Sequence, residues 1–326
     1  MSDSLGIKLL PLLLEPASDW SVQELSERAG LIDADVLSGF DQLRRDGCGI
    51  DIHGPERVRL VSSGLSCWGD YLEASIEHQL RVEVYHQTSS TQDVLKRLLD
   101  GEQRGATVAM ADEQTAGRGR RGRSWLAASG DGLLMSLAWP LEGSEPVERM
   151  PVIGCLAVAE SVHLLPTHQA ATIRWPNDVL LNDRKLAGVL IERVADASGQ
   201  SWAVIGWGIN VLGTPEVEGP QRLDGSITAP TSLADLGLRI DRLWLAHAVL
   251  ERFVSLTKLD TSDLAERWRV RSSDLGRQAT LKVNGQMLCG EVIDVDITSG
   301  LVLRDHSGVC HWVPSAQASR ACDEVA

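Results

Sequence analysis

The apolar residues near the start of the chain recur at helical spacing. A capping box at 21–24 predicts a helix that Gly30 ends, and a second helix follows from Asp33. Two short alternating runs, 50–53 and 57–61, then flank Gly54-Pro55-Glu56, as in a hairpin. Two helices, a glycine turn and a hairpin predict a winged helix-turn-helix domain over 1–66.

The middle of the chain alternates strand-like and helix-like patterns. Helices are predicted at 91–99, 151–165 and 241–256. Strands are predicted at 82–86, 107–111, 133–138, 172–175, 179–181, 185–192 and 203–205. Several of these strands have hairpin spacing, which favours a mostly antiparallel or mixed sheet with helices on one side. We assign 67–272 to this domain.

The last part of the chain has short strands punctuated by turn residues. A helix is predicted near 261–269, and alternating runs between 274 and 320 are separated by Asn-Gly and Ser-Gly pairs. This pattern predicts a small SH3-like β-barrel over 273–326. The whole chain is therefore expected to be α+β.

Composition narrows the class of protein. The 326 residues carry a net charge of −14, which excludes a general polyanion binder. The six cysteines are scattered and form no C-x-x-C pair, as is typical of a reduced cytoplasmic protein. No apolar run approaches the ~18 residues of a membrane span, and no export signal is seen. We expect a cytoplasmic protein without a membrane partner.

The N-terminal domain is a poor match to its predicted DNA-binding role. Residues 1–66 contain six basic and eleven acidic residues, and the second helix carries three aspartates. Phosphate contacts dominate DNA affinity, so DNA binding and a scaffold that packs on or dimerises with the core remain open alternatives. The candidate DNA-binding residues are Gln42, Arg44, Arg45, Arg57 and Arg59.

The most unusual segment is an Arg/Gly loop between two predicted strands. Gly117-Arg118-Gly119-Arg120-Arg121-Gly122-Arg123 places four arginines and three glycines in seven residues. Guanidinium groups hold carboxylate and phosphate oxygens, and glycines let the backbone approach an anion. A site for a small anionic molecule is favoured over an RNA-binding tract or a solvated loop, because the segment is single and flanked by apolar strands.

A second group of polar residues follows further along the chain. Arg174-Trp175-Pro176-Asn177-Asp178 predicts a turn whose side chains can bind a ligand. Lys185 begins an apolar run, where a lysine needs an anion unless it reaches the surface. Gly208-Ile209-Asn210 ends a strand and is a weak signal alone.

Together these motifs resemble biotin–protein ligases. The resemblance rests on Gln114, the Arg/Gly loop with Trp125, Arg174–Asp178, Lys185-Leu186-Ala187-Gly188 and Gly208-Ile209-Asn210-Val211. The two end domains are similar to those of the bifunctional bacterial class, which also represses the biotin operon. The resemblance therefore implies a ligase that is also a DNA-binding transcriptional repressor.

The resemblance implies a two-step, AMP-forming reaction. The carboxylate of biotin attacks the α-phosphate of ATP and gives biotinyl-5′-AMP and pyrophosphate. A lysine of a biotin carboxyl carrier protein then takes the biotinyl group. Mg²⁺ is expected with the nucleotide. Operator DNA and a second copy of the chain are further possible partners.

The resemblance also assigns roles to residues. Lys185 is the main catalytic candidate, with Arg118 and Arg120 in the loop that closes over the adenylate. The predicted biotin and adenylate contacts are Ser90, Thr91, Gln92, Gln114, Gly117, Arg118, Gly119, Arg120, Arg121, Trp125, Asn177, Asp178, Lys185, Gly188, Gly208 and Asn210. No metal ligand is assigned to the protein. Gln92 stands where the family usually has Asn, and Arg174 where it usually has Lys.

Two other functions compete with this hypothesis. Lipoate–protein ligases share the core architecture, although the Arg/Gly loop favours biotin. A biotin-sensing transcription factor, with or without catalysis, is the alternative from a different class. An RNA-binding protein is a more distant third.

Overall fold

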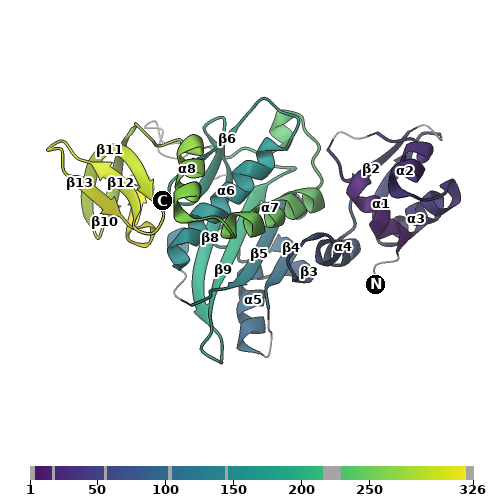
Figure 1. The fold of residues 1–326 in the computed structure, drawn as a ribbon, viewed down its shortest axis with the longest axis horizontal. Helices are drawn as coiled ribbons and strands as arrows, with labels where there is room; N and C mark the ends of the chain where they lie inside the picture. The colour runs from purple at the N-terminus through teal and green to yellow at the C-terminus, as the bar shows by residue number, and fades with distance from the viewer. Residues whose placement is uncertain are drawn as a thin grey trace.

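The computed structural model describes residues 4–16, 19–54, 57–101, 105–143, 146–215 and 229–320. Three parts follow one another along the longest axis (Figure 1). A small helical part lies at one end, a large sheet with helices lies in the middle, and a small sheet lies at the other end. No helix in the described ranges is long and apolar enough to cross a membrane.

The N-terminal part contains three helices and a hairpin. The helices are α1 (Leu5–Leu13), α2 (Val22–Ala29) and α3 (Asp33–Arg45), and the strands are β1 (Gly49–Ile52) and β2 (Val58–Ser62). The predicted capping box is present, because the Ser21 hydroxyl accepts from Glu24 N and the Glu24 carboxylate accepts from Ser21 N. The expected hairpin turn at Pro55 and Glu56 lies outside the described residues. Helix α1 was not predicted, although it buries four residues against the other helices.

The linker from this part is fastened to the central domain. Ser63 donates from its backbone N–H and its hydroxyl to the two carboxylate oxygens of Asp241, each over 2.7 Å. Asp241 is also the N-cap of α7 (Arg242–Thr257). Trp68, which opens α4 (Trp68–Ser75), donates from its indole nitrogen to the Ser63 hydroxyl. One aspartate thus holds both the linker and the start of a core helix.

The central sheet has seven strands in the order β3-β4-β5-β9-β8-β7-β6. Only β3 and β4 are parallel, so the predicted mixed sheet is confirmed. The strands are β3 (Arg81–Thr88), β4 (Thr107–Gln114), β5 (Gly132–Pro140), β6 (Ala171–Arg174), β7 (Asp178–Leu181), β8 (Arg184–Ala195) and β9 (Ser201–Asn210).

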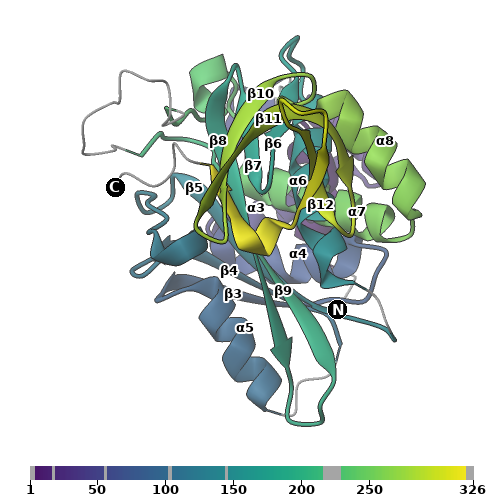
Figure 2. The ribbon, with the colours of Figure 1, turned by 90° about the vertical axis from the view of Figure 1, so that its left-hand side faces the viewer.

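Helices cover both faces of this sheet, so the prediction of helices on one side was wrong. Helices α6 (Met150–His163) and α7 pack on the face that carries Val108 and Met110. Helix α5 (Thr91–Asp100) packs on the opposite face, against Ala109 and its neighbours. Figure 2 shows α5 on the side of the sheet away from α6 and α7. Both sides of β4 are buried, and β4 ends at Gln114, directly before the Arg/Gly loop.

The C-terminal part follows α8 (Thr261–Arg271) and has five strands in the order β13-β12-β11-β10-β14. Its strands are β10 (Gln278–Val283), β11 (Gln286–Asp296), β12 (Gly300–Arg304), β13 (Cys310–Val313) and β14 (Ala318–Arg320). Within the described residues, the edge strands β13 and β14 do not pair with each other. The described sheet is therefore open, and closure into an SH3-like barrel stays a prediction.

Candidate active site

A cavity lies where the first turn of α5, the Arg/Gly loop and the middle of β8 and β9 meet. It is lined by fourteen of the sixteen residues that were predicted to contact biotin and adenylate. Those lining residues are Ser90, Thr91, Gln92, Gln114, Arg118, Gly119, Arg120, Arg121, Trp125, Asn177, Asp178, Lys185, Gly188 and Gly208. Segments nearly 120 residues apart in the sequence thus form one wall.

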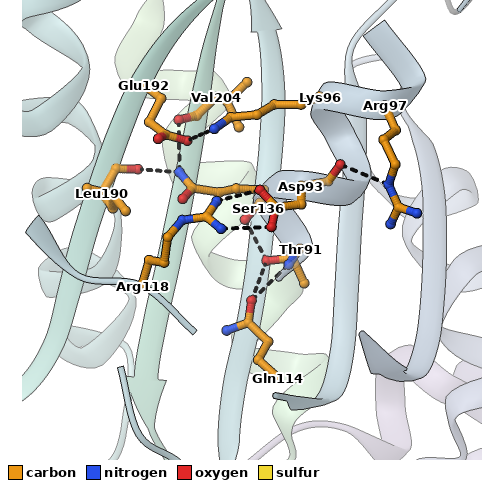
Figure 3. Close-up of polar contacts among 11 residues, drawn as sticks. Thr91, Asp93, Lys96, Arg97, Gln114, Arg118, Ser136, Leu190, Glu192 and Val204 are labelled. Atoms are coloured by element: carbon orange, nitrogen blue, oxygen red, sulfur yellow. Dashed lines mark hydrogen bonds and ion pairs between the residues drawn. The ribbon is translucent and has the colours of Figure 1, made fainter. Parts of the chain in front are cut away.

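The N-terminus of α5 is connected to β4 and β5 by a polar network (Figure 3). Thr91 donates to the side-chain oxygen of Gln114 from its backbone N–H over 2.8 Å and from its hydroxyl over 3.2 Å. The Thr91 hydroxyl also lies 2.7 Å from the hydroxyl of Ser136 on β5. Since its oxygen is engaged, the orientation of the Gln114 amide is fixed. Sequence reasoning missed Ser136, because a serine in an apolar strand carries no motif.

Gln92 lies one residue deeper and is almost fully buried. Its side-chain nitrogen donates to the carbonyls of Leu190 on β8, over 3.1 Å, and Val204 on β9, over 3.4 Å. A Cβ at Gly206 would lie 3.1 Å from the Gln92 amide carbon. The extra methylene of Gln92 is therefore used to reach two strands, and Gly206 leaves the room for it.

Two glycines of the sheet form a flat surface for Trp125. A Cβ at Gly208 would lie 2.3 Å from the indole ring, and a Cβ at Gly188 would lie 3.1 Å from it. Within the described chain, the buried indole nitrogen of Trp125 has no hydrogen-bond partner. Gly117 closes the loop, because its carbonyl accepts from Trp125 N and a side chain there would meet the Trp125 carbonyl. Trp125 thus packs between the loop and the sheet.

A carboxylate with two cations lies at the other end of the cavity. Asp178 lies 2.7 Å from the Lys185 ammonium and 2.8 Å from the Arg174 guanidinium. Burial raises the pKa of Asp178, but the charges and hydrogen bonds of Lys185 and Arg174 outweigh it, so this pKa lies below its ordinary value. The Lys185 ammonium also lies 5.6 Å from the centre of the Trp125 ring. An anionic Asp178 therefore holds Lys185 at the cavity wall.

The Arg/Gly loop is a short hairpin that spans the cavity. Arg118 and Ser124 form an isolated bridge at its base, and Gly119 N donates to Arg123 O over 2.7 Å. Arg121, at the tip, has a left-handed φ of +58°, and Gly122 follows with φ +75°. The base and the tip of the loop are held by different parts of the protein.

Two arginines of the hairpin make these anchoring contacts. Arg118 donates from both terminal nitrogens to the two oxygens of Asp93, each over 2.7 Å. Arg120 donates to the side chain of Asn177 and to the backbone carbonyl of Ser315 near the C-terminal sheet. Sequence reasoning missed Asp93 and Ser315. The only available signal for Asp93 was its place in the first turn of the helix that starts after Ser90.

Two predicted site residues, Gly117 and Asn210, lie beside the cavity and line an adjoining one. The Asn210 amide donates to the Thr231 carbonyl over 3.0 Å and to the Lys185 carbonyl over 3.5 Å. Thr231 N in turn donates to Lys185 O. Asn210 therefore holds the backbone around Lys185 in place through these hydrogen bonds.

The candidate DNA-binding residues are mostly engaged within the N-terminal part. Gln42 accepts from the Ser4 hydroxyl and from Gly6 N, each over 3.0 Å, so its amide oxygen is bound to the start of α1. Carboxylates lie within 4 Å of three arginines: Asp41 at Arg44, Asp19 at Arg57 and Asp51 at Arg59. Arg45 is exposed. The amide oxygen of Gln42 thus has a structural partner, and the DNA-binding role of these residues stays a prediction.

Comparisons with known proteins agree with this geometry. The model of the biotin/lipoate A/B protein ligase family matches residues 84–210, which include α5, the Arg/Gly loop and β9. The biotin–[acetyl-CoA-carboxylase] ligase of Mycobacterium tuberculosis is 33% identical over 234 residues, which cover 68% of this chain and 83% of that protein. The bifunctional ligase/repressor BirA of Bacillus subtilis is 26% identical to this chain. That match covers 95% of this chain and 97% of the Bacillus protein.

Solved structures give the same result. The biotin protein ligase of Aquifex aeolicus, determined in complex with biotin and ATP, has a TM-score of 0.59 and 25% identity. The match covers 74% of this chain and 99% of that one. The predicted resemblance is confirmed, and this chain belongs to the biotin/lipoate A/B protein ligase family as a relative of the biotin protein ligases.

Proposed function

We propose that the protein is a biotin–protein ligase that forms biotinyl-5′-AMP from biotin and ATP and transfers biotin to a carrier-protein lysine. The observation that carries the proposal is the single cavity in which α5, the Arg/Gly hairpin and the Lys185 region converge. Neither step needs a protein nucleophile, so positioning and charge stabilisation supply the catalysis. The cavity offers arginines, a lysine and oriented amides for these tasks.

Lys185 is the proposed catalytic residue. Its ammonium is fixed by Asp178 and faces the cavity beside Trp125. When the carboxylate oxygen of biotin attacks the α-phosphorus, negative charge develops on the phosphate oxygens and the bond to pyrophosphate breaks. An ammonium held in place before the reaction stabilises this charge without reorganisation. In the second step the acceptor amine attacks the biotinyl carbonyl, and AMP leaves.

The opposite half of the cavity is the proposed biotin subsite. Thr91 and Gln114 supply oriented polar groups at the start of α5. The half-buried Trp125 indole offers an apolar surface, and its buried nitrogen is a donor without a partner in the described chain. A ring system with polar edges and an apolar body needs both kinds of contact.

Mg²⁺ is proposed to enter this site with ATP. The described residues contain no group of three or more possible metal ligands. Asp178, the carboxylate that pairs with Lys185, already meets two cations. We therefore assign Mg²⁺ to the ATP phosphates, where it enters with the substrate, and no residue of the chain is given to it.

Mass spectrometry of a biotin carboxyl carrier domain tests the activity. We expect one biotinyl group to be added when the full chain, biotin and ATP are present. Omission of ATP, or a carrier whose acceptor lysine is replaced by arginine, should leave the carrier unmodified. Parallel reactions with lipoate distinguish the related activity. Modification by lipoate and none by biotin would overturn the assignment to biotin.

A repressor role is the proposed second function of the N-terminal part. The bifunctional relatives and the helix–helix–hairpin layout support a winged helix-turn-helix that reads operator DNA. The four candidate arginines Arg44, Arg45, Arg57 and Arg59 are all exposed, and the acidic surroundings oppose tight binding. Gel shifts with DNA upstream of biotin-synthesis genes, with and without biotin and ATP, test this role. Absence of specific binding at physiological salt would contradict it.

The remaining assignments follow the same proposal. We divide the chain at 66/67 and 272/273, and we propose that the last part closes into an SH3-like barrel. We also propose a cytoplasmic enzyme that can form a homodimer. All five described cysteines are free thiols, which supports the reducing compartment. Sedimentation with and without biotin and ATP measures the dimer.

A further inference from the structure

Two of the six cysteines meet in the folded chain, although they lie 19 positions apart in the sequence. Cys48 lies between α3 and β1 in the N-terminal part, and Cys67 lies directly before α4. Their Sγ atoms are 3.7 Å apart, and the two residues are 5% and 2% exposed. A disulfide joins sulfur atoms at about 2 Å. A small movement of the two side chains would therefore bring them to bonding distance.

The linker holds the two cysteines side by side through Gly64. The Gly64 N–H donates to Cys48 Sγ over 3.2 Å, and the Cys67 thiol donates to the Gly64 carbonyl over 3.0 Å. A Cβ at Gly64 would collide with the backbone carbonyl oxygen of Asp46, in the turn after α3. The linker thus passes against this turn at a position where the chain has no side chain.

The two thiols differ in their surroundings. The hydrogen bond with Cys67 lowers the pKa of Cys48, and the Gly64 N–H lowers it further against the effect of burial. The hydrogen bond with Cys48 and burial both raise the pKa of Cys67. Cys48 is therefore the partner that forms the thiolate, which is the nucleophilic species, and Cys67 stays protonated beside it.

We propose that Cys48 and Cys67 form a reversible disulfide when a hydroperoxide reaches the protein. The Cys48 thiolate attacks one oxygen of hydrogen peroxide, the O–O bond breaks, and a sulfenic acid and hydroxide form. The Cys67 sulfur then attacks the Cys48 sulfur and displaces water, while its proton leaves with the oxygen. Two thiols are oxidised and one peroxide is reduced to two molecules of water. This inference does not rest on the ligase function.

The position of the pair gives this bond its effect. Cys48 belongs to the N-terminal part, and Cys67 follows the proposed boundary at 66/67. In the reduced protein the contacts described for the linker are the hydrogen bonds from Ser63 to Asp241 and from Trp68 to Ser63. A disulfide would persist when these hydrogen bonds open. Oxidation would therefore fasten the N-terminal part covalently to the start of the central domain.

Peptide mapping of the full-length protein tests the bond. The reduced protein is treated with hydrogen peroxide, its remaining thiols are alkylated during denaturation, and it is digested with trypsin without reduction. Cys48 lies in the tryptic peptide 46–57 and Cys67 in the peptide 60–81. We expect these two peptides to be joined and to separate after treatment with dithiothreitol. Separate, alkylated peptides, or links mainly to other cysteines, would overturn the proposal.

Serine variants test the order of the two steps. In Cys67→Ser, peroxide should leave a sulfenic acid at Cys48 that dimedone traps. In Cys48→Ser, neither the link nor a trapped sulfenic acid is expected. Cys289→Ser, at an exposed thiol on β11, is the matched control and should form the link normally. Trapping at Cys67 and not at Cys48 would overturn the assigned roles.

Thermal unfolding tests the effect of the bond on stability. Because the disulfide closes the loop 48–67, oxidation should raise the Tm of the wild-type chain by several degrees. Peroxide should not raise the Tm of Cys67→Ser. An equal rise in both proteins would mean that the bond does not fasten the N-terminal part. The mapping of the wild-type chain decides the bond itself even if a variant fails to fold.

Discussion

The indole of Trp125 occupies the space in which a side chain at Gly208 would lie, with 2.3 Å between a Cβ there and the ring. The ring has few alternatives, because the backbone of Trp125 is bonded to Gly117 and its other edge faces Gly188. The proposed biotin subsite is therefore shaped by the two glycines on which Trp125 packs, Gly188 on β8 and Gly208 on β9.

Gly208→Ala should displace Trp125 and with it the Arg/Gly hairpin. We expect biotin affinity to fall at least tenfold, which corresponds to about 1.4 kcal/mol. Calorimetric titration with biotin measures the change. Gly69→Ala is a suitable control, because a Cβ there meets its nearest atom at an ordinary 3.7 Å. Normal biotin affinity in Gly208→Ala would show that Trp125 does not shape the subsite.

Lys185→Ala should abolish adenylate formation without unfolding the chain. Loss of a preorganised charge that stabilises a transition state typically costs about 10²- to 10³-fold in rate. Pyrophosphate release in the presence of biotin and ATP measures the first step. Lys258→Ala, at an exposed pair with Glu77, controls for loss of a lysine elsewhere. A normal rate of pyrophosphate release in Lys185→Ala would show that Lys185 is not the catalytic residue.

Asp178→Asn should destabilise the fold by roughly 2 kcal/mol, because Lys185 and Arg174 would keep their charges and lose their shared anion. The folded pKa of Asp178 lies below its unfolded value of about 3.9. The carboxylate therefore contributes stability above about pH 4, and that contribution is lost as pH falls through the folded pKa.

Urea unfolding at several pH values tests this dependence. The difference between wild type and Asp178→Asn should be constant from about pH 7 to 5 and should shrink below about pH 4. A difference that grows on acidification would mean that the pKa of Asp178 is raised by folding and not lowered.

Asp241→Ala should cost more stability than Ser63→Ala. The first change removes the N-cap of α7 and both contacts to the linker, and an N-cap alone contributes about 1 kcal/mol. The second removes only the hydroxyl that bridges Asp241 and Trp68. Thermal unfolding of the two variants checks the order. Equal losses would mean that the cap contributes nothing.

The sequence predicted most elements of the central domain because their patterns are long and regular. Helices α5, α6 and α7 each begin and end within two residues of the predicted limits. Helix α1 was not predicted because it contains Pro11, and proline is disfavoured inside a helix. The two helical layers were missed for a different reason. A strand buried on both faces, such as β4, shows that something covers each face but not what covers it.

In the site too, some residues were predicted from the sequence and others were missed. Residues such as Gln114 and Lys185 were predicted because they belong to motifs of the family that the chain resembles. The partners that orient them were not, since Ser136 and Asp93 are ordinary residues in ordinary patterns. Their contacts join residues far apart in sequence, which local spacing does not encode. The contact between the Gln42 amide oxygen and Gly6 was missed for the same reason, because Gly6 lies in the helix that was not predicted.

The bond between Ser63 and Asp241 has a thermodynamic consequence. Arg242, which follows Asp241 in the sequence, packs on the Trp68 ring. Arg242 also pairs with Asp112 over 2.7 Å. Asp112 lies two residues before the end of β4, the strand that leads into the Arg/Gly loop. If operator binding shifts the linker, it also shifts the Arg242–Asp112 pair beside the strand that leads into the loop. Linkage then requires reciprocity: whatever factor DNA applies to adenylate affinity, adenylate must apply to DNA affinity. The factor by which DNA changes adenylate affinity, once measured, would therefore also give the factor by which adenylate changes DNA affinity.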